Sequence, residues 1–356
     1  MNNRADWFIE PFLHTRKLKP ENQETPISFV GGDKTPAHLF YLRNHFDYPH
    51  LTVSAYFLPV NGLVKTPRIF SIQEIMSLPA KRLKMTLECS GDKRSLFKPK
   101  VFGEQWEKGA ISQGYWKGVS LKTVLQYTGL SDQAVEVVVE GYDFGERKDL
   151  IQVVPYKRSL PLRKALHGDT LIAYEYNDQP IPFKHGFPFR LIVPGWYGMA
   201  SVKWIKQITV VGKPFQGPFQ TIDYVYFPNP KSDVGKFPVT TMNVNSTIQQ
   251  PLNMDILQTG THFIYGIAWT GEGKIKRVEV SFDNGLTWEG ANIEQKPKHP
   301  YSWVWWTYEW NVYEKGEYTI LSRAADSAGR TQPLQAVWNR KGYGYNAADK
   351  ICVKVE

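Results

Sequence analysis

The chain has 356 residues, of which 42% are hydrophobic and 22% charged, and its formal net charge is +9. This length favours two domains, the composition predicts a soluble globular protein, and no apolar run approaches the ~20 residues of a membrane helix. Residues 1–20 lack a signal-peptide core and a twin-arginine pair. We therefore expect a cytoplasmic protein, or a periplasmic one if a leader has been removed.

The excess of basic residues suggests an anionic partner. Nucleic acid is the usual candidate, but the lysines and arginines are dispersed and form no run of five or more. An anionic cofactor together with an anionic substrate would also draw basic residues into one site. Part of the charge can serve solubility alone.

Residues 1–38 are polar and rich in Pro and Gly, which indicates an N-terminal segment that wraps around the rest of the chain. Residues 39–228 then alternate short apolar stretches with helix-like patches. The elements expected there are helices at 72–78 and 121–129 and strands at 135–140 and 189–193. This order lacks regular strand–helix–strand units and predicts an α+β domain with mixed sheets.

The Pro-rich stretch 227–238 has the character of an interdomain linker, and the pattern changes after it. Residues 239–356 contain short alternating strands separated by tight turns, which predicts an immunoglobulin-like β-sandwich. Its clearest strands are expected at 277–282, 318–323 and 351–355. The aromatic strand 303–310 allows either sandwich packing or ligand stacking, because Trp303 and Trp305 share one face and Trp306 the other.

Cys89 stands between an apolar approach (residues 83–87) and a basic, Gly-containing turn (residues 90–94). Lysine and arginine neighbours favour the thiolate, which is the form that binds metals. A small buried core residue is the simpler explanation for a single cysteine. The two cysteines lie too far apart to suggest a disulfide framework, and neither a C-x-x-C-H haem motif nor a Cys/His zinc cluster is present.

Five ordered motifs give a more specific signal. They lie at 41–45, 89–94, 106–119, 185–204 and 338–344. In this order and spacing they resemble the sulfite oxidase family of molybdopterin-dependent oxidoreductases. The resemblance extends from about residue 30 to the C-terminus, and it implies a sulfite-oxidase-type mixed α/β molybdopterin-binding domain followed by an immunoglobulin-like dimerisation domain.

The resemblance assigns Cys89 as the molybdenum ligand, and a soft thiolate suits a metal already held by dithiolene sulfurs. It implies a molybdenum–molybdopterin cofactor and no haem. The residues at the family's cofactor-binding positions are Tyr41, Leu42, Arg43, Asn44, His45, Asp143, His185, Arg190, Ser201, Val202 and Lys203. Arg190 and Lys203 suit the cofactor phosphate, and Asp143 suits the N–H groups of the pterin.

The family's anion pocket corresponds here to Arg94, Arg43, Trp106 and Tyr224, with Lys350 in the place of a C-terminal arginine. Trp106 has core packing as its alternative. Three departures concern this pocket: Asp92 replaces a common asparagine, Lys350 replaces the arginine, and Val225 replaces a common lysine. With these departures we still expect the chain to bind the cofactor, but the identity of the substrate stays open.

The resemblance therefore implies an oxo-transfer enzyme, with sulfite oxidation as the default reaction. It also implies a homodimer, a small oxyanion substrate and a separate electron acceptor, with no nucleic-acid or membrane partner. One alternative is the reduction of nitrate or an S-oxide on the same centre. Another is a non-enzymatic, basic and aromatic-rich module that binds nucleic acid or glycan.

Overall fold

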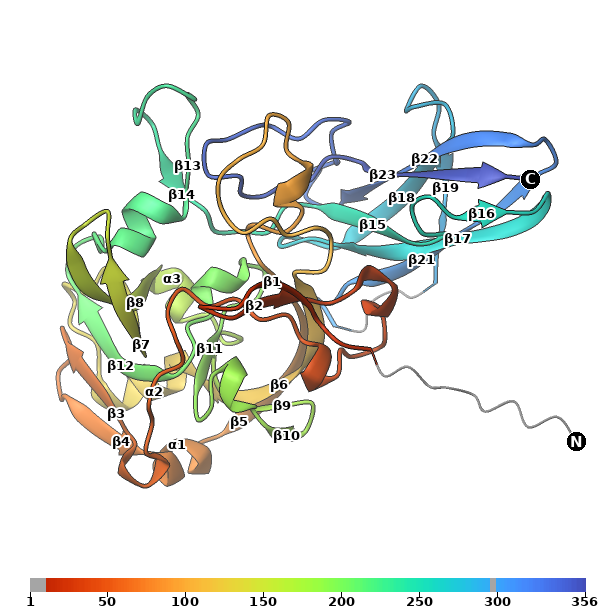
Figure 1. Ribbon diagram of the computed structural model, residues 1–356. Coiled ribbons are helices and arrows are strands. Elements are labelled where there is room, and N and C mark those ends of the chain that lie inside the picture. The colour runs from red at the N-terminus through yellow and green to blue at the C-terminus, as the bar shows by residue number, and fades with distance from the viewer. Residues whose placement is uncertain (1–10, 295–298) are drawn as a thin grey trace, which may run out of the picture.

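The computed structural model describes residues 11–294 and 299–356, and it places two sets of β-sheets side by side (Figure 1). Of the expected wrapping segment, residues 1–10 lie outside the described residues. The remainder begins with the small sheet β1 (His14–Lys17) and β2 (Asn22–Glu24). In the described part of the chain, no helix is long and apolar enough to cross a membrane.

The first set of sheets forms a mixed α+β unit. One sheet has the order β4 (Arg68–Ser71), β3 (Phe57–Gly62), β12 (Ile205–Val211), β7 (Glu136–Arg147) and β8 (Gln152–Pro161). The other has the order β10 (Gln179–Pro180), β9 (Leu171–Tyr176), β6 (Ile111–Ser120) and β5 (Ala80–Glu88), with β11 (Arg190–Ile192) on β9. Side chains from both sheets share one hydrophobic core.

The expected helices are confirmed. Helix α1 (Ile72–Ser77) begins with a capping box, in which the Ser71 side chain accepts from the Glu74 N–H and the Glu74 carboxylate accepts from the Ser71 N–H. Helix α2 (Leu121–Thr128) ends at Gly129, and α3 (Leu162–Ala165) is a single turn.

Strand β7 runs further than the expected strand 135–140 and includes Gly141, Tyr142 and Asp143. Its register on β8 shifts between Glu140 and Phe144. Such an irregularity bends a strand and re-aims its side chains. The bend places Asp143 in the wall of the pocket that contains Cys89.

The second set of sheets is the expected β-sandwich. One sheet has the order β15 (Asn245–Gln250), β17 (Gly260–Trp269), β21 (Val304–Val312) and β20 (Asn292–Ile293). The other has the order β16 (Ile256–Leu257), β23 (Asp349–Val355), β22 (Gly316–Asp326), β18 (Ile275–Ser281) and β19 (Glu289–Gly290). The proline-rich stretch before it is closed by pairing of β13 (Val225–Tyr226) with β14 (Phe237–Pro238).

The tryptophans around β21 join the two units. Trp306 and Trp310 pack in the core of the sandwich. Trp303 packs in the core of the first unit, and Trp305 packs against that core. The alternation predicted from the sequence is therefore correct, and these rings pack in or against the two cores.

Side chains cross between the units close to Cys89. The Lys93 ammonium donates to the Asn245 side-chain oxygen at 2.8 Å and to the Ser246 carbonyl at 3.0 Å. The Trp269 indole donates to the Glu88 carboxylate at 2.8 Å. The two residues that flank the Cys89 turn are therefore anchored on the sandwich.

Gly31 shows how closely the N-terminal segment follows this junction. A Cβ there would lie 2.5 Å from the Trp305 ring, so only glycine lets the segment approach β21. The Gln249 amide also donates to the Ile27 carbonyl. This part of the expected wrapping segment bridges the two units.

Candidate active site

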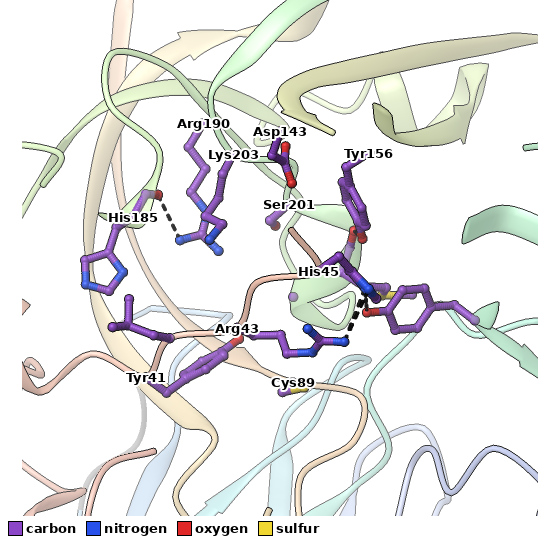
Figure 2. Close-up of a pocket in the computed structure, with 14 residues that line it drawn as sticks. Tyr41, Arg43, His45, Cys89, Asp143, Tyr156, His185, Arg190, Ser201 and Lys203 are labelled. Carbon is purple, nitrogen blue, oxygen red and sulfur yellow. Dashed lines mark hydrogen bonds between the residues drawn. The ribbon is translucent and has the colours of Figure 1, made fainter. Parts of the chain in front are cut away.

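Loops and strand ends of the first unit enclose one deep pocket that contains Cys89. The space between its side chains is about 590 Å³, which includes solvent at its open mouth. Figure 2 shows its side chains gathered around the cavity. The lining residues are Tyr41, Leu42, Arg43, His45, Cys89, Asp143, Tyr156, His185, Arg190, Gly198, Met199, Ser201, Lys203 and Tyr224.

Cys89 follows directly after strand β5, in a turn that fixes its thiol. Its N–H donates to the Ala110 carbonyl, its carbonyl accepts from the Asp92 N–H, and its sulfur accepts from the Gly91 N–H at 3.5 Å. Burial raises the pKa of the Cys89 thiol, while Arg43 and Arg94 oppose that rise. A bound metal cation would favour the thiolate further.

The pocket gathers far more positive than negative groups. Arg43, Arg190 and Lys203 line it, and Asp143 is the one carboxylate among the lining residues. Burial, followed by repulsion from Arg190, lowers the pKa of Lys203 well below its usual value. Burial also lowers the pKa of Arg190 to about 10. Arg190 and Arg43 both repel the Lys203 charge, and cations buried together in this way indicate a site built for an anion.

The two histidines of the pocket are held neutral. Burial, with Arg190 as the next cause, lowers the pKa of His185 to about 3. Burial and Arg43 lower the pKa of His45 well below its usual value. Neutral rings keep one nitrogen as a donor and one as an acceptor, which suits a heterocyclic ligand.

Two buried polar atoms in the pocket wall have no hydrogen-bond partner within the described chain. They are Nε of Arg190 and Oδ1 of Asp143. Burial raises the pKa of Asp143 to about 6, and Lys203 opposes that rise. Molybdopterin carries a phosphate for Arg190 and Lys203 and pterin N–H groups for Asp143, so the residues present fit this cofactor.

A smaller polar group lies beside Cys89 and is centred on Tyr224. The Tyr224 hydroxyl and His45 Nε2 share a hydrogen bond of 2.6 Å. The Tyr224 and Tyr343 rings pack with centroids 5.1 Å apart, and the Arg94 guanidinium lies 5.0 Å from the centroid of the Tyr343 ring. Tyr343 belongs to the C-terminal loop of the sandwich, so the second unit completes this part of the site.

The structure places the remaining predicted residues as follows. Arg94 lies beside the pocket and donates to the Gly342 and Glu104 carbonyls at 3.1 and 3.0 Å. Trp106 is fully buried in the hydrophobic cluster of Cys89 and does not line the pocket, which matches the core-packing alternative. Asn44 accepts a hydrogen bond from Lys203, and Val202 is buried in the core.

Lys350 is not part of this site, contrary to the expectation. It lies on β23, where side chains alternate between the two faces. Asp349 points inward and pairs with Lys108 at 2.8 Å, so Lys350 points outward and is exposed. Lys350 lines a different groove, together with Glu107 and Lys108.

Asp92 is buried beside Cys89, and one of its carboxylate oxygens accepts from the Ala110 N–H at 2.8 Å. Burial raises its pKa to about 7, with Lys93 opposing. A carboxyl group that is largely protonated below this pH carries little charge. It therefore resembles the family's asparagine more closely than the sequence suggests.

Sequence reasoning missed Tyr156, Arg158 and Tyr343. Tyr156 and Arg158 occupy alternate positions of β8 and are both buried. That alternation is the signal that could have placed both side chains on the inner face. Nothing in the sequence shows that Tyr343, in the distant C-terminal loop, reaches Tyr224.

Comparison with known families supports the assignment made from the motifs. Residues 45–219 match the oxidoreductase molybdopterin binding domain, and residues 236–356 match the Mo-co oxidoreductase dimerisation domain. The sulfite oxidase of Arabidopsis thaliana is 32% identical over 93% of this chain and 91% of its own length. The chain belongs to the sulfite oxidase family. Its fold class and its molybdopterin-binding character are those predicted from the motifs.

Further similar proteins include a second sulfite oxidase, a nitrate reductase and a sulfane dehydrogenase. The mitochondrial sulfite oxidase of Drosophila melanogaster is 34% identical over 99% of this chain, which spans 65% of that relative's length. A nitrate reductase of Phaseolus vulgaris is 31% identical over 91% of this chain and 40% of its own. The crystal structure of the sulfane dehydrogenase SoxCD from Paracoccus pantotrophus superposes with a TM-score of 0.81 at 26% identity, covering 97% of this chain and 86% of that one.

Proposed function

We propose that this chain is a molybdenum-dependent oxidoreductase that oxidises sulfite to sulfate and passes the electrons to a separate acceptor. The balanced reaction takes sulfite and water to sulfate, two protons and two electrons. The observation that carries the proposal is the buried pocket in which the Cys89 thiol shares one cavity with Arg43 and Tyr224. A dianion is drawn into such a cationic cleft.

The bound molybdenum cofactor would supply oxygen-atom transfer and take up the electron pair. Cys89 would hold its metal, while Arg190, Lys203 and Asp143 would hold its phosphate and pterin ends. The substrate is oriented by residues of this chain. Neutral His45 can donate through Nε2 to the Tyr224 oxygen, which leaves the Tyr224 hydroxyl proton free for an oxyanion.

Tyr224 is suited to remain a donor. Burial raises its pKa to about 12, with Arg43 opposing, so the phenol stays protonated near neutral pH. Arg43 adds a permanent charge next to it. Together they would hold the anion close to Cys89 in one orientation, which reduces the entropic cost of reaching the reactive geometry.

A second candidate is the reduction of nitrate or an S-oxide on the same centre. The similarity to a nitrate reductase favours it. The same cationic pocket would accept nitrate.

A substrate panel on the molybdenum-loaded protein tests the proposal. Sulfite is assayed with ferricyanide as the electron acceptor, and nitrate and dimethyl sulfoxide are assayed with reduced viologen as the donor. We expect turnover with sulfite that exceeds either reduction. Turnover with nitrate and none with sulfite would replace the proposed function by its alternative.

We also infer a homodimer, because the second unit matches a dimerisation domain. Light scattering at micromolar concentration should give a mass near twice 40.9 kDa. A mass of one chain at that concentration would contradict this part of the proposal.

A further inference from the structure

Arg158 is a fully buried arginine whose charge is compensated only by longer-range attraction, including that of Asp223. It lies on β8, two residues beyond the pocket-lining Tyr156 and on the same face of the strand. One guanidinium nitrogen donates to the Phe219 carbonyl, whereas Nε and Nη2 have no hydrogen-bond partner. Within residues 11–294 and 299–356, no carboxylate forms an ion pair with it.

A buried cation without a direct ion pair is costly, so its persistence needs an explanation. Burial lowers the pKa of Arg158, which shows that its surroundings favour the charged form less than water does. Buried charges in proteins are paired, or they face a charged ligand. No carboxylate of the described chain forms an ion pair with Arg158, and an anion bound in the adjacent pocket would help to compensate its charge.

Its position indicates which anion. The Arg158 guanidinium lies 5.5 Å from the centroid of the Tyr224 ring, and Tyr224 lines the pocket beside Cys89. Together with the contact between Arg94 and Tyr343 described above, this contact forms a series in which two aromatic rings lie between two guanidinium groups. Its members are Arg94, Tyr343, Tyr224 and Arg158.

The series places one buried guanidinium, Arg158, next to the Tyr224 ring and a second, Arg94, one ring further away. Salt and water screen such buried charges weakly, so they act over several ångströms. The resemblance to the family implied a third cation at Lys350, but that residue points into another groove. Arg158 is a buried cation next to Tyr224 that no sequence motif indicated.

We propose that Arg158 is the third cation of the substrate-anion site and acts on the bound oxyanion through Tyr224, as a positioning residue. This proposal depends on the proposed function in one respect, which is that the substrate is an oxyanion. Its ligand class is a small divalent oxyanion such as sulfite or sulfate.

The test compares three variants of the molybdenum-loaded protein. Arg158→Gln removes the charge and keeps a donor for the Phe219 carbonyl, whereas Arg158→Lys keeps both. Arg163→Met removes a charge from an exposed position on α3 and serves as the matched control. The readouts are the Kd of sulfate by titration calorimetry, KM and kcat with sulfite, and the melting temperature.

We expect Arg158→Gln to weaken sulfate binding and raise the KM for sulfite by about tenfold, which corresponds to about 1.4 kcal/mol. Its kcat should stay within about twofold of wild type. Arg158→Lys should recover most of the affinity, and Arg163→Met should change neither constant.

Sulfate affinity unchanged in Arg158→Gln would overturn the proposal. Equal losses in Arg158→Gln and Arg158→Lys would also overturn it, because the bond to the Phe219 carbonyl rather than the charge would then be what matters. If the wild type binds sulfate but does not oxidise sulfite, the proposed function fails while the sulfate Kd still decides the role of Arg158.

Discussion

A substitution in the sandwich, Gly342→Ala, should weaken substrate binding in the first unit. Gly342 has a φ of +60°, and its carbonyl accepts from Arg94 Nε at 3.1 Å. A Cβ there would lie 3.0 Å from Cγ and Nε of Arg94 and 3.1 Å from Val101. The left-handed backbone costs about 1–2 kcal/mol for a residue other than glycine. In addition, Arg94 would have to move by a few tenths of an ångström.

That movement is transmitted to the site because Arg94 packs on Tyr343, which packs on Tyr224. Misplacement of a positioning group by 1 Å can cost about a hundredfold in rate, so a smaller shift should raise the KM for sulfite by about three- to tenfold. The matched control is Gly329→Ala. Gly329 has a φ of +87°, but a Cβ there meets nothing within 4 Å.

Steady-state kinetics with sulfite and thermal unfolding are measured for both variants. Both should lose a similar backbone contribution to stability, and only Gly342→Ala should show a raised KM. Equal KM values in the two variants would refute the idea that the C-terminal loop of the sandwich holds Arg94 in place for the substrate.

Three further predictions concern single side chains. Asp92→Asn should stabilise the protein by more than about 1 kcal/mol at pH 8 but not at pH 4. The reason is that the pKa of Asp92 in the folded state is raised to about 7. The wild-type protein therefore loses stability as the pH rises from about 4 through 7, and the variant does not. Equal melting-temperature differences at both pH values would contradict this. Lys350→Arg should leave the KM for sulfite unchanged, and a clear decrease would place residue 350 in the site. Lys203→Met should reduce the molybdenum bound per purified chain, because a charge-assisted hydrogen bond of roughly 1.5–3 kcal/mol to the cofactor phosphate is lost; undiminished metal content would remove Lys203 from the cofactor site.

The motifs predicted the fold class, the family and the residues that gather around the pocket, because short segments at strand ends keep their role when the fold is kept. Local signals also gave α1, α2 and the alternating tryptophans of β21. These depend on capping, glycine and periodicity, which act within a few residues.

Less could be predicted at positions that depend on long-range packing. Lys350 aligned with a family arginine, but the inward turn of Asp349 on β23 directs it away from the site. Arg158 and Tyr343 reach Tyr224 from β8 and from the last loop of the sandwich. Alternation along β8 could place Arg158 on the inner face but not next to Tyr224, and only the packing of the two units brings Tyr343 to Tyr224.

The central claim, that Cys89 holds the metal of a molybdenum cofactor, is tested most directly by molybdenum K-edge X-ray absorption on the loaded protein. Cys89→Ser is compared with wild type, and Cys352→Ser on β23 serves as the control. We expect Cys89→Ser to retain bound molybdenum and show one sulfur scatterer fewer, with Cys352→Ser unchanged. The same sulfur count in Cys89→Ser and wild type would contradict the account.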